Sequence, residues 1–391
     1  SPATTGRPPT PAAALAAAVP AAAVQSAALH QGVPAPLDPN AVLSPATTGR
    51  PPTPAAALAT AVQSAALHQG GLAPLLADIA ALADAGTPLP APVARAAAAV
   101  LALRVDGNVA VSADDVKQAF ARSGTLLEAH LTAPPTLVPG AVPPASAPDL
   151  KAALVVLQQV LKTWIDGASD QASTGALPKI ASPALAMSAA APGEAPHAPI
   201  PPPYRGAPTV GQPPMPPSID LDAGPRAIGS HLLAETDAAI GRQILLQAAS
   251  LPDQSDLGAR GSAPEARWNF EVPIQLPQGT AIAQFEIARD GHHQGDGETE
   301  SGGPVWRARF SLDIEPMGAV HAQVVLMGAR TAVTLWADRP ASTDKLRANA
   351  GELAAALRGL DLEPGDVNIR QGEPPPVVAP PHAGHFLDRA T

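Results

Sequence analysis

Three runs of alternating apolar and polar residues near the C-terminus constrain the fold more than any other feature. In the first run, residues 306–314, every second side chain is apolar. The runs 320–326 and 331–337 repeat the pattern after short turns that contain Gly318 and Gly328. A period of two is typical of a strand with one buried and one solvated face. Because the turns are tight, the three segments are predicted to form an antiparallel meander.

The flanking segments complete the expected domain. Residues 268–276 alternate in the same way, and 280–289 is predicted to pair with them. Pro273 cannot donate to a ladder, so the first of these strands is expected at an edge. From 340 to 360 apolar residues recur every three or four positions, which predicts one amphipathic helix. With a last short strand at 366–371, the expected fold class is α+β, an antiparallel sheet covered by one main helix.

Proline and alanine dominate the chain ahead of this domain. The sequence holds 49 Pro and 32 Gly, and only 3% of its residues are aromatic. Ordering a residue costs roughly 1–2 kcal/mol of backbone entropy, which alanine methyl groups and proline rings offset poorly. The composition therefore predicts short folded islands and scattered helices in a largely disordered Ala/Pro-rich background.

A direct repeat lies at the start of the chain. Residues 1–16 recur at 44–59, and 23–32 recur at 61–70. The two blocks are offset by different distances, whereas stacked structural repeats keep a constant spacing. The repeat is therefore interpreted as a duplication within a disordered tail.

Helical periodicity appears in the middle of the chain. Ser112 and Asp115 have the spacing of a capping box that opens a helix over 114–131. The region 72–166 is either a small bundle or a set of helices that form only with a partner. The predicted regions are 1–71, a disordered Ala/Pro-rich region with the repeat; 72–166, the helical segment; 167–224, a Pro-rich linker; 225–252, an amphipathic helix; 265–373, the α+β domain; and 374–391, a disordered tail.

The C-terminal residues also carry a family resemblance. The run W-R-A-R-F-S-L-D-I-E-P-M-G-A-V-H-A-Q-V, residues 306–324, resembles the core of the flagellar hook-length control C-terminal domain. A strand ending in A-D-R-P and a leucine-rich helix extend the likeness, which covers about 267–373. Met317 stands where the family usually has leucine. Upstream, residues 121–131 resemble a segment of larger family members.

The resemblance implies an exported length sensor. Its C-terminal domain would contact the cytoplasmic domain of the type III export gate and switch export from hook to filament subunits. Hook or hook-cap subunits are further implied partners, and a monomer is expected. The implied location is the bacterial cytoplasm, followed by export through the flagellar type III apparatus, and no cleavable signal peptide is visible. The residues expected to bind the gate are Glu315, Pro316, Met317, Gly318 and Val320; alternatively, Pro316 and Gly318 only shape a β-turn.

Other function classes find little support in the sequence. A formal net charge of −10 argues against nucleic acid as a partner, and no run of apolar residues suggests membrane insertion. The chain has no cysteine, no phosphate-binding glycine loop and no G-x-S-x-G elbow. His292-His293 lies among acidic residues and His382 with His385 forms H-x-x-H, but neither has ligand spacing that fixes a metal geometry. No cofactor, metal or enzymatic activity is expected.

Two alternatives to the flagellar hypothesis remain at this point. The first is a needle-length regulator of a virulence type III secretion system, which shares this architecture. The second is an Ala/Pro-rich scaffolding protein unrelated to export.

Overall fold

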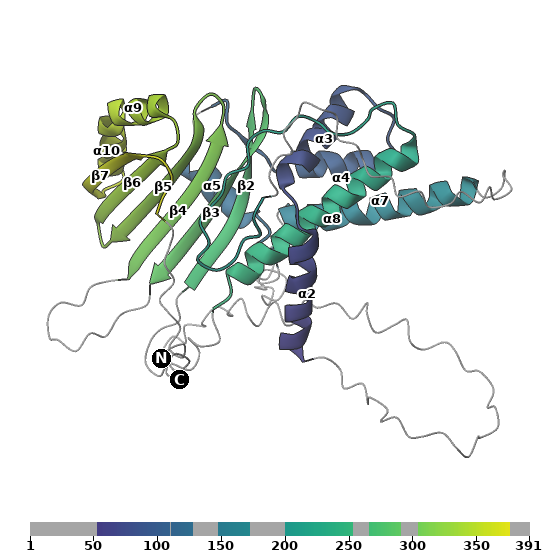
Figure 1. Cartoon of the computed structure of the whole chain (residues 1–391), viewed down its shortest axis with the longest axis horizontal. Coiled ribbons are helices and arrows are strands. Elements are labelled where there is room, and N and C mark those ends of the chain that lie inside the picture. Colours follow the sequence, from purple (N-terminus) through teal and green to yellow (C-terminus); the bar gives the residue numbers. More distant parts are fainter. Residues whose placement is uncertain are drawn as a thin grey trace, which may run out of the picture.

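The computed structural model describes residues 53–109, 111–127, 148–172, 200–252, 266–290 and 304–375. In this part of the chain a seven-stranded sheet lies beside a group of helices (Figure 1). The helices are α2 (Pro54–His68), α3 (Leu72–Asp84), α4 (Ala91–Leu101), α5 (Ala113–Ala121), α7 (Leu150–Ala172), α8 (Pro225–Ala249), α9 (Pro340–Ala348) and α10 (Ala350–Gly359). The strands are β1 (Val105–Asp106), β2 (Ala266–Leu276), β3 (Gly279–Asp290), β4 (Val305–Ile314), β5 (Gly318–Met327), β6 (Arg330–Ala337) and β7 (Glu363–Gln371).

The strands lie side by side in sequence order. The predicted meander of β4, β5 and β6 is confirmed, with Trp306 opposite Leu326 and Val324 opposite Val333. The two edges differ from the expected antiparallel sheet, because β1 pairs with β2 and β7 pairs with β6 in parallel. Parallel pairing follows from the connection: α9 and α10 carry the chain back along the sheet before β7 begins. The α+β fold class is confirmed, with a mixed rather than a purely antiparallel sheet.

The expected single helix after β6 is two helices. α9 ends at Ala348 and α10 begins at Ala350, and both lie along β6 or β7. Asn349 separates them, and its side-chain Nδ2 donates to the carbonyl oxygen of Lys345 at 3.1 Å. Asparagine competes in this way for backbone groups and therefore favours helix ends over helix interiors.

The helices on the other side of the sheet share a hydrophobic core. α7 presents its leucines at spacings of four, three and four, and each is at most 1% exposed. They pack with apolar residues of α3, α4 and α8. α8 also contacts β2, so the helical group and the sheet are joined. The leucines of α7 are Leu150, Leu154, Leu157 and Leu161.

Part of the region expected to be disordered is a helix. α2 lies in the second copy of the repeat, and Thr53 caps it by accepting a hydrogen bond from the backbone of Ala56. Pro54 occupies the first turn, where its missing N–H costs nothing. The helix packs against α8, where Gly70 N donates to the carbonyl oxygen of Ala238 at 3.1 Å. Tertiary packing therefore stabilises a segment whose alanine content alone could not.

The helix opened by Ser112 is shorter than predicted. The capping box is confirmed, because the Ser112 hydroxyl accepts from Asp115 N and the Asp115 carboxylate accepts from Ser112 N. The helix ends at Ala121, however, and Gly124 follows with a φ of +94°. Residues 128–131 of the predicted helix lie outside the described residues.

Residues 200–224, which we call the strap, are packed and do not form the solvated linker expected from their proline content. Gln212 pairs with Ile282 of β3 through two backbone hydrogen bonds of 2.9 Å. The hydroxyl of Thr209 lies 2.7 Å from that of Ser311 on β4, and both residues are buried. Prolines have no N–H that burial could leave without a partner, so a proline-rich strap can lie on a sheet at little cost.

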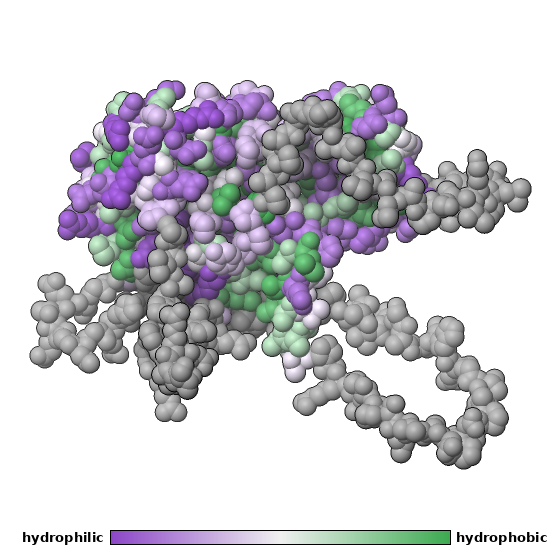
Figure 2. Space-filling model, viewed as in Figure 1, coloured by the Kyte–Doolittle hydropathy of each residue, from purple (hydrophilic) through white to green (hydrophobic). Residues whose placement is uncertain are grey.

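Surface character follows this arrangement. Figure 2 shows mostly hydrophilic residues over the end of the sheet that carries α9 and α10, and hydrophobic residues gathered beside α2. Among the described helices, none alone has the length and apolar content needed to cross a membrane. The pair α2 and α3 passes that test only together and is bent by 61°.

The division of the chain into the regions given above stays a prediction.

Candidate functional site

The residues expected to bind a partner form the turn between β4 and β5. Glu315, Pro316 and Met317 connect the two strands, and the peptide bond between Glu315 and Pro316 is cis. Gly318 has a φ of +71°, and a Cβ atom there would lie 2.8 Å from Nε of Arg339. The backbone conformation therefore favours glycine at this position, and any larger residue would also force the Arg339 side chain to shift.

Arg339 fixes the turn to the start of α9. Its guanidinium donates to both carboxylate oxygens of Glu315 at 2.6 Å, and Nη1 also donates to the carbonyl oxygen of Pro316 at 2.7 Å. This bidentate pairing holds the pKa of Glu315 below its ordinary value, chiefly because the Arg339 hydrogen bonds stabilise the charged carboxylate. Ser342 adds a second anchor, because its hydroxyl donates to the carbonyl oxygen of Met317 at 2.6 Å.

The five predicted residues lie together but differ in what they present to solvent. The side chain of Glu315 is 63% exposed, and Pro316 is exposed beside it. Met317 is half-buried, Gly318 is buried, and Val320 pairs with Leu312 and Ala337 within the sheet. The exposed part of the turn is thus Glu315 and Pro316, and Gly318 and Val320 shape or anchor it.

Sequence reasoning missed Arg339 and Ser342. The sequence did contain a clue to Arg339. This arginine is part of the A-D-R-P run at the end of β6, and a side chain just before a helix can reach a neighbouring turn. Two further segments lie against the turn or the end of β4 that leads into it. Gln278, from the turn between β2 and β3, donates to the carbonyl oxygen of Glu315 at 3.1 Å. Gly211 of the strap lies so close to β4 that a Cβ atom there would be 2.8 Å from Asp313 N.

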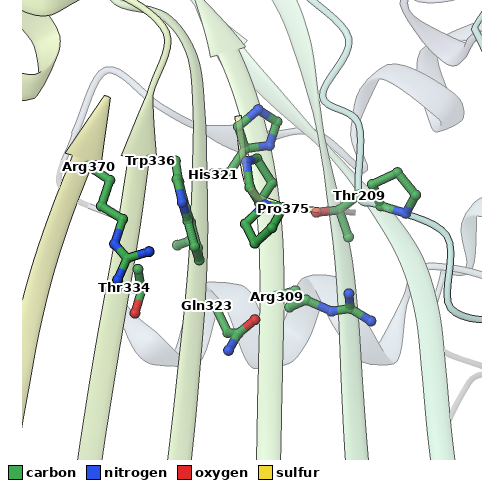
Figure 3. A pocket seen from close by; sticks show the side chains of 11 residues that line it. Thr209, Arg309, His321, Gln323, Thr334, Trp336, Arg370 and Pro375 are labelled. Atoms are coloured by element: carbon green, nitrogen blue, oxygen red, sulfur yellow. The ribbon is translucent and has the colours of Figure 1, made fainter. Parts of the chain in front are cut away.

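A groove lies on the same sheet (Figure 3). Its floor comes from adjacent strands, and it lies between the strap and the residues that follow β7. Burial lowers the pKa of His321, whose Nδ1 lies 2.5 Å from the Ser311 hydroxyl. Arg309 is paired with Glu286 at 2.7 Å, and Arg267 pairs with the same carboxylate. The residues labelled in Figure 3 are Thr209, Arg309, His321, Gln323, Thr334, Trp336, Arg370 and Pro375.

The histidines noted in the sequence, His292, His293, His382 and His385, lie outside the described residues. Within the described residues, the structure instead brings together Asp78, His231 and Glu235 at the interface of α3 and α8, a cluster that sequence reasoning missed.

Comparison with known proteins points to one family. The profile of the flagellar hook-length control protein FliK matches residues 294–376, a segment that contains the turn, β4 to β7 and both C-terminal helices. β2 and β3, which the sequence resemblance also covered, precede the matched segment. No curated protein and no solved structure matches the chain significantly. By the match to residues 294–376, the C-terminal part of this chain belongs to the flagellar hook-length control family.

Proposed function

We propose that this protein controls flagellar hook length as an exported sensor. Its C-terminal domain would contact the cytoplasmic domain of the type III export gate and switch export from hook to filament subunits. The observation that carries the proposal is the family match, because it spans the whole β4–β7 unit together with the exposed turn. The proposed role is regulatory and requires no cofactor.

The exposed turn is the proposed contact. Glu315 offers a carboxylate and Pro316 a rigid apolar ring, and Arg339 with Ser342 holds both in place. A surface that is ordered before binding loses less conformational entropy on association, which favours binding. Gln278 adds a hydrogen bond to the carbonyl oxygen of Glu315 in the same turn.

Export places a further demand on the chain. A protein that passes through a narrow channel must unfold, and a typical domain costs about 5–15 kcal/mol to unfold. The absence of cysteine means that no disulfide would add a covalent barrier. Hook or hook-cap subunits are the proposed partners during transit.

Deleting residues 265–391 tests the proposal as a whole. Cells that produce the shortened chain should form overlong hooks without filaments, because the switch is lost. Normal filaments in these cells would contradict the proposal. Genes for hook or for needle subunits beside the coding gene would separate flagellar control from needle-length control.

A further inference from the structure

Three potential metal ligands meet where α3 packs against α8. His231 and Glu235 are one turn apart on α8, so their side chains lie on the same face. Asp78 of α3 faces them, with Oδ2 2.8 Å from Nε2 of His231. Oε1 of Glu235 lies 3.6 Å from the same nitrogen, and one ligand atom from each residue lies within 4.8 Å of the others.

The cluster brings two carboxyl groups together in a poorly hydrated place. Asp78 is fully buried, and the side chain of Glu235 is 15% exposed. Oε2 of Glu235 is buried and has no hydrogen-bond partner. A buried carboxylate oxygen without a partner is costly, and a bound cation would remove that cost.

The strap orients one of the carboxyl groups. Oδ1 of Asp78 accepts hydrogen bonds from the backbone N–H groups of Ser218 at 2.6 Å and Ile219 at 3.1 Å. These bonds leave Oδ2 directed toward His231, with the Ser218 hydroxyl 3.0 Å away. Outer hydrogen bonds of this kind typically fix the ligands of protein metal sites.

On these observations we propose that Asp78, His231 and Glu235 bind a divalent transition-metal ion, with Zn²⁺ as the best fit. One imidazole and two carboxylates suit Zn²⁺, and three protein ligands leave a fourth position for water. His231 is 39% exposed, which gives the ion a path from solvent. Zinc-bound nitrogen and oxygen atoms are separated by roughly 3.3 Å in a tetrahedral site, so binding moves His231 away from Asp78 by about half an ångström.

The bound ion would tie three segments together. Asp78 belongs to α3, His231 and Glu235 belong to α8, and Ser218 links the strap to the same carboxylate. The site lies outside the segment that matches the hook-length control family, and its proposed role is to stabilise the helical group. It is independent of the contact proposed for the turn.

The test uses the full chain, first stripped of metal with a chelator and then titrated with Zn²⁺ while thermal unfolding is followed. The midpoint should rise by a few degrees, since an ion that binds only the folded state stabilises it. Glu235→Gln and, separately, His231→Gln should lose this shift and bind at least about tenfold more weakly in calorimetry. His68→Ala, which alters an exposed histidine of α2, should behave like the parent chain.

Two results would overturn the proposal. One is a midpoint that Zn²⁺ leaves unchanged in the parent chain. The other is a shift that survives in both Glu235→Gln and His231→Gln, which would assign the binding to histidines elsewhere. Visible absorption of added Co²⁺ gives a second readout, because tetrahedral coordination should produce strong bands in the parent chain and not in either variant.

Discussion

Arg242 of α8 donates a hydrogen bond of 2.6 Å from Nε to Oε1 of Glu271 in β2, and each side chain is only 1% exposed. Nη1 of Arg242 also donates to Gln69 Oε1 and to the carbonyl oxygen of Pro201, both at 3.1 Å. Gln212 of the strap donates to the same Glu271 oxygen at 3.0 Å. Four segments distant in sequence therefore converge on one buried ion pair, which joins the helical group to the sheet.

Replacing Arg242 with methionine should destabilise the protein strongly. The change leaves the Glu271 carboxylate buried without its cation, which typically costs about 3–5 kcal/mol. Urea unfolding of the purified chain measures the loss. The double variant Arg242→Met/Glu271→Met should recover most of it, because no buried charge remains. A single variant that loses less than about 1 kcal/mol would show that the pair does not hold the two parts together.

Gln212 should contribute more to the stability of the folded protein than a typical residue of a proline-rich segment. Its Oε1 accepts from the backbone N–H groups of Leu72 and Ala73, so it caps α3, whose own Gly71 provides no side-chain cap. Gln212→Ala is expected to cost about 1–3 kcal/mol of unfolding free energy, because buried N–H groups lose their acceptor. The matched control is Gln159→Ala on the exposed face of α7, which should stay within about 0.5 kcal/mol of the parent. Equal effects of the two changes would contradict the capping role.

Substitutions at two glycines test whether Arg339 constrains the turn between β4 and β5. Gly318 and Gly328 both have positive φ, at +71° and +61°. A Cβ atom at Gly318 would meet Arg339, whereas at Gly328 nothing lies within 4 Å. Gly318→Ala should therefore lower the melting temperature clearly more than Gly328→Ala, which adds only the backbone strain of roughly 1 kcal/mol. Similar losses would mean that Arg339 does not constrain the turn.

Glu235 should make the stability of the metal-free protein depend on pH. Burial, and then the charge of Asp78, raises its pKa to about 8 from the ordinary 4.5. The folded state thus holds the proton more tightly than the unfolded state. The resulting stability is complete below about pH 4.5 and is lost as the pH rises toward 8. Among the described residues, Asp78 and His231 face it.

Urea unfolding with a chelator present, at about pH 5 and about pH 8, measures this dependence. The parent chain should lose more stability over that interval than Glu235→Gln, which cannot ionise. If both proteins show the same dependence, Glu235 is not the group responsible.

Sequence periodicity predicted the parts of the fold that depend on local patterns. The alternation from Trp306 to Ile314 identified β4, and the Ser112–Asp115 capping box identified the start of α5. The expected antiparallel sheet did not include the parallel pairing of the edge strand β7, because strand direction depends on the connection, which here consists of two helices separated by Asn349.

Features that depend on long-range contacts could not be predicted. Gln212 and Thr209 look like solvated residues of a proline-rich linker, and only their partners on α3 and β4 show that they are buried. Asp78 and His231 lie 153 positions apart, so no local spacing relates them. The candidate turn itself was located correctly, but its anchor, Arg339, belongs to the next loop.

The most direct measurement of the central claim is the length of hooks, and the presence of filaments, in cells that produce Glu315→Arg as their only copy of the protein. The exposed carboxylate is lost without removing any buried group, and Glu352→Arg on α10 supplies a control for the same change elsewhere in the domain. Adding Arg339→Glu to Glu315→Arg restores an ion pair at the turn. The double variant therefore distinguishes a role of Glu315 in the structure of the turn from a direct contact between Glu315 and the partner. The account predicts overlong hooks without filaments for both Glu315 variants and normal flagella for the control. Normal hooks and filaments in the Glu315→Arg cells would contradict it, and rescue by the added Arg339→Glu would limit the turn to a structural role.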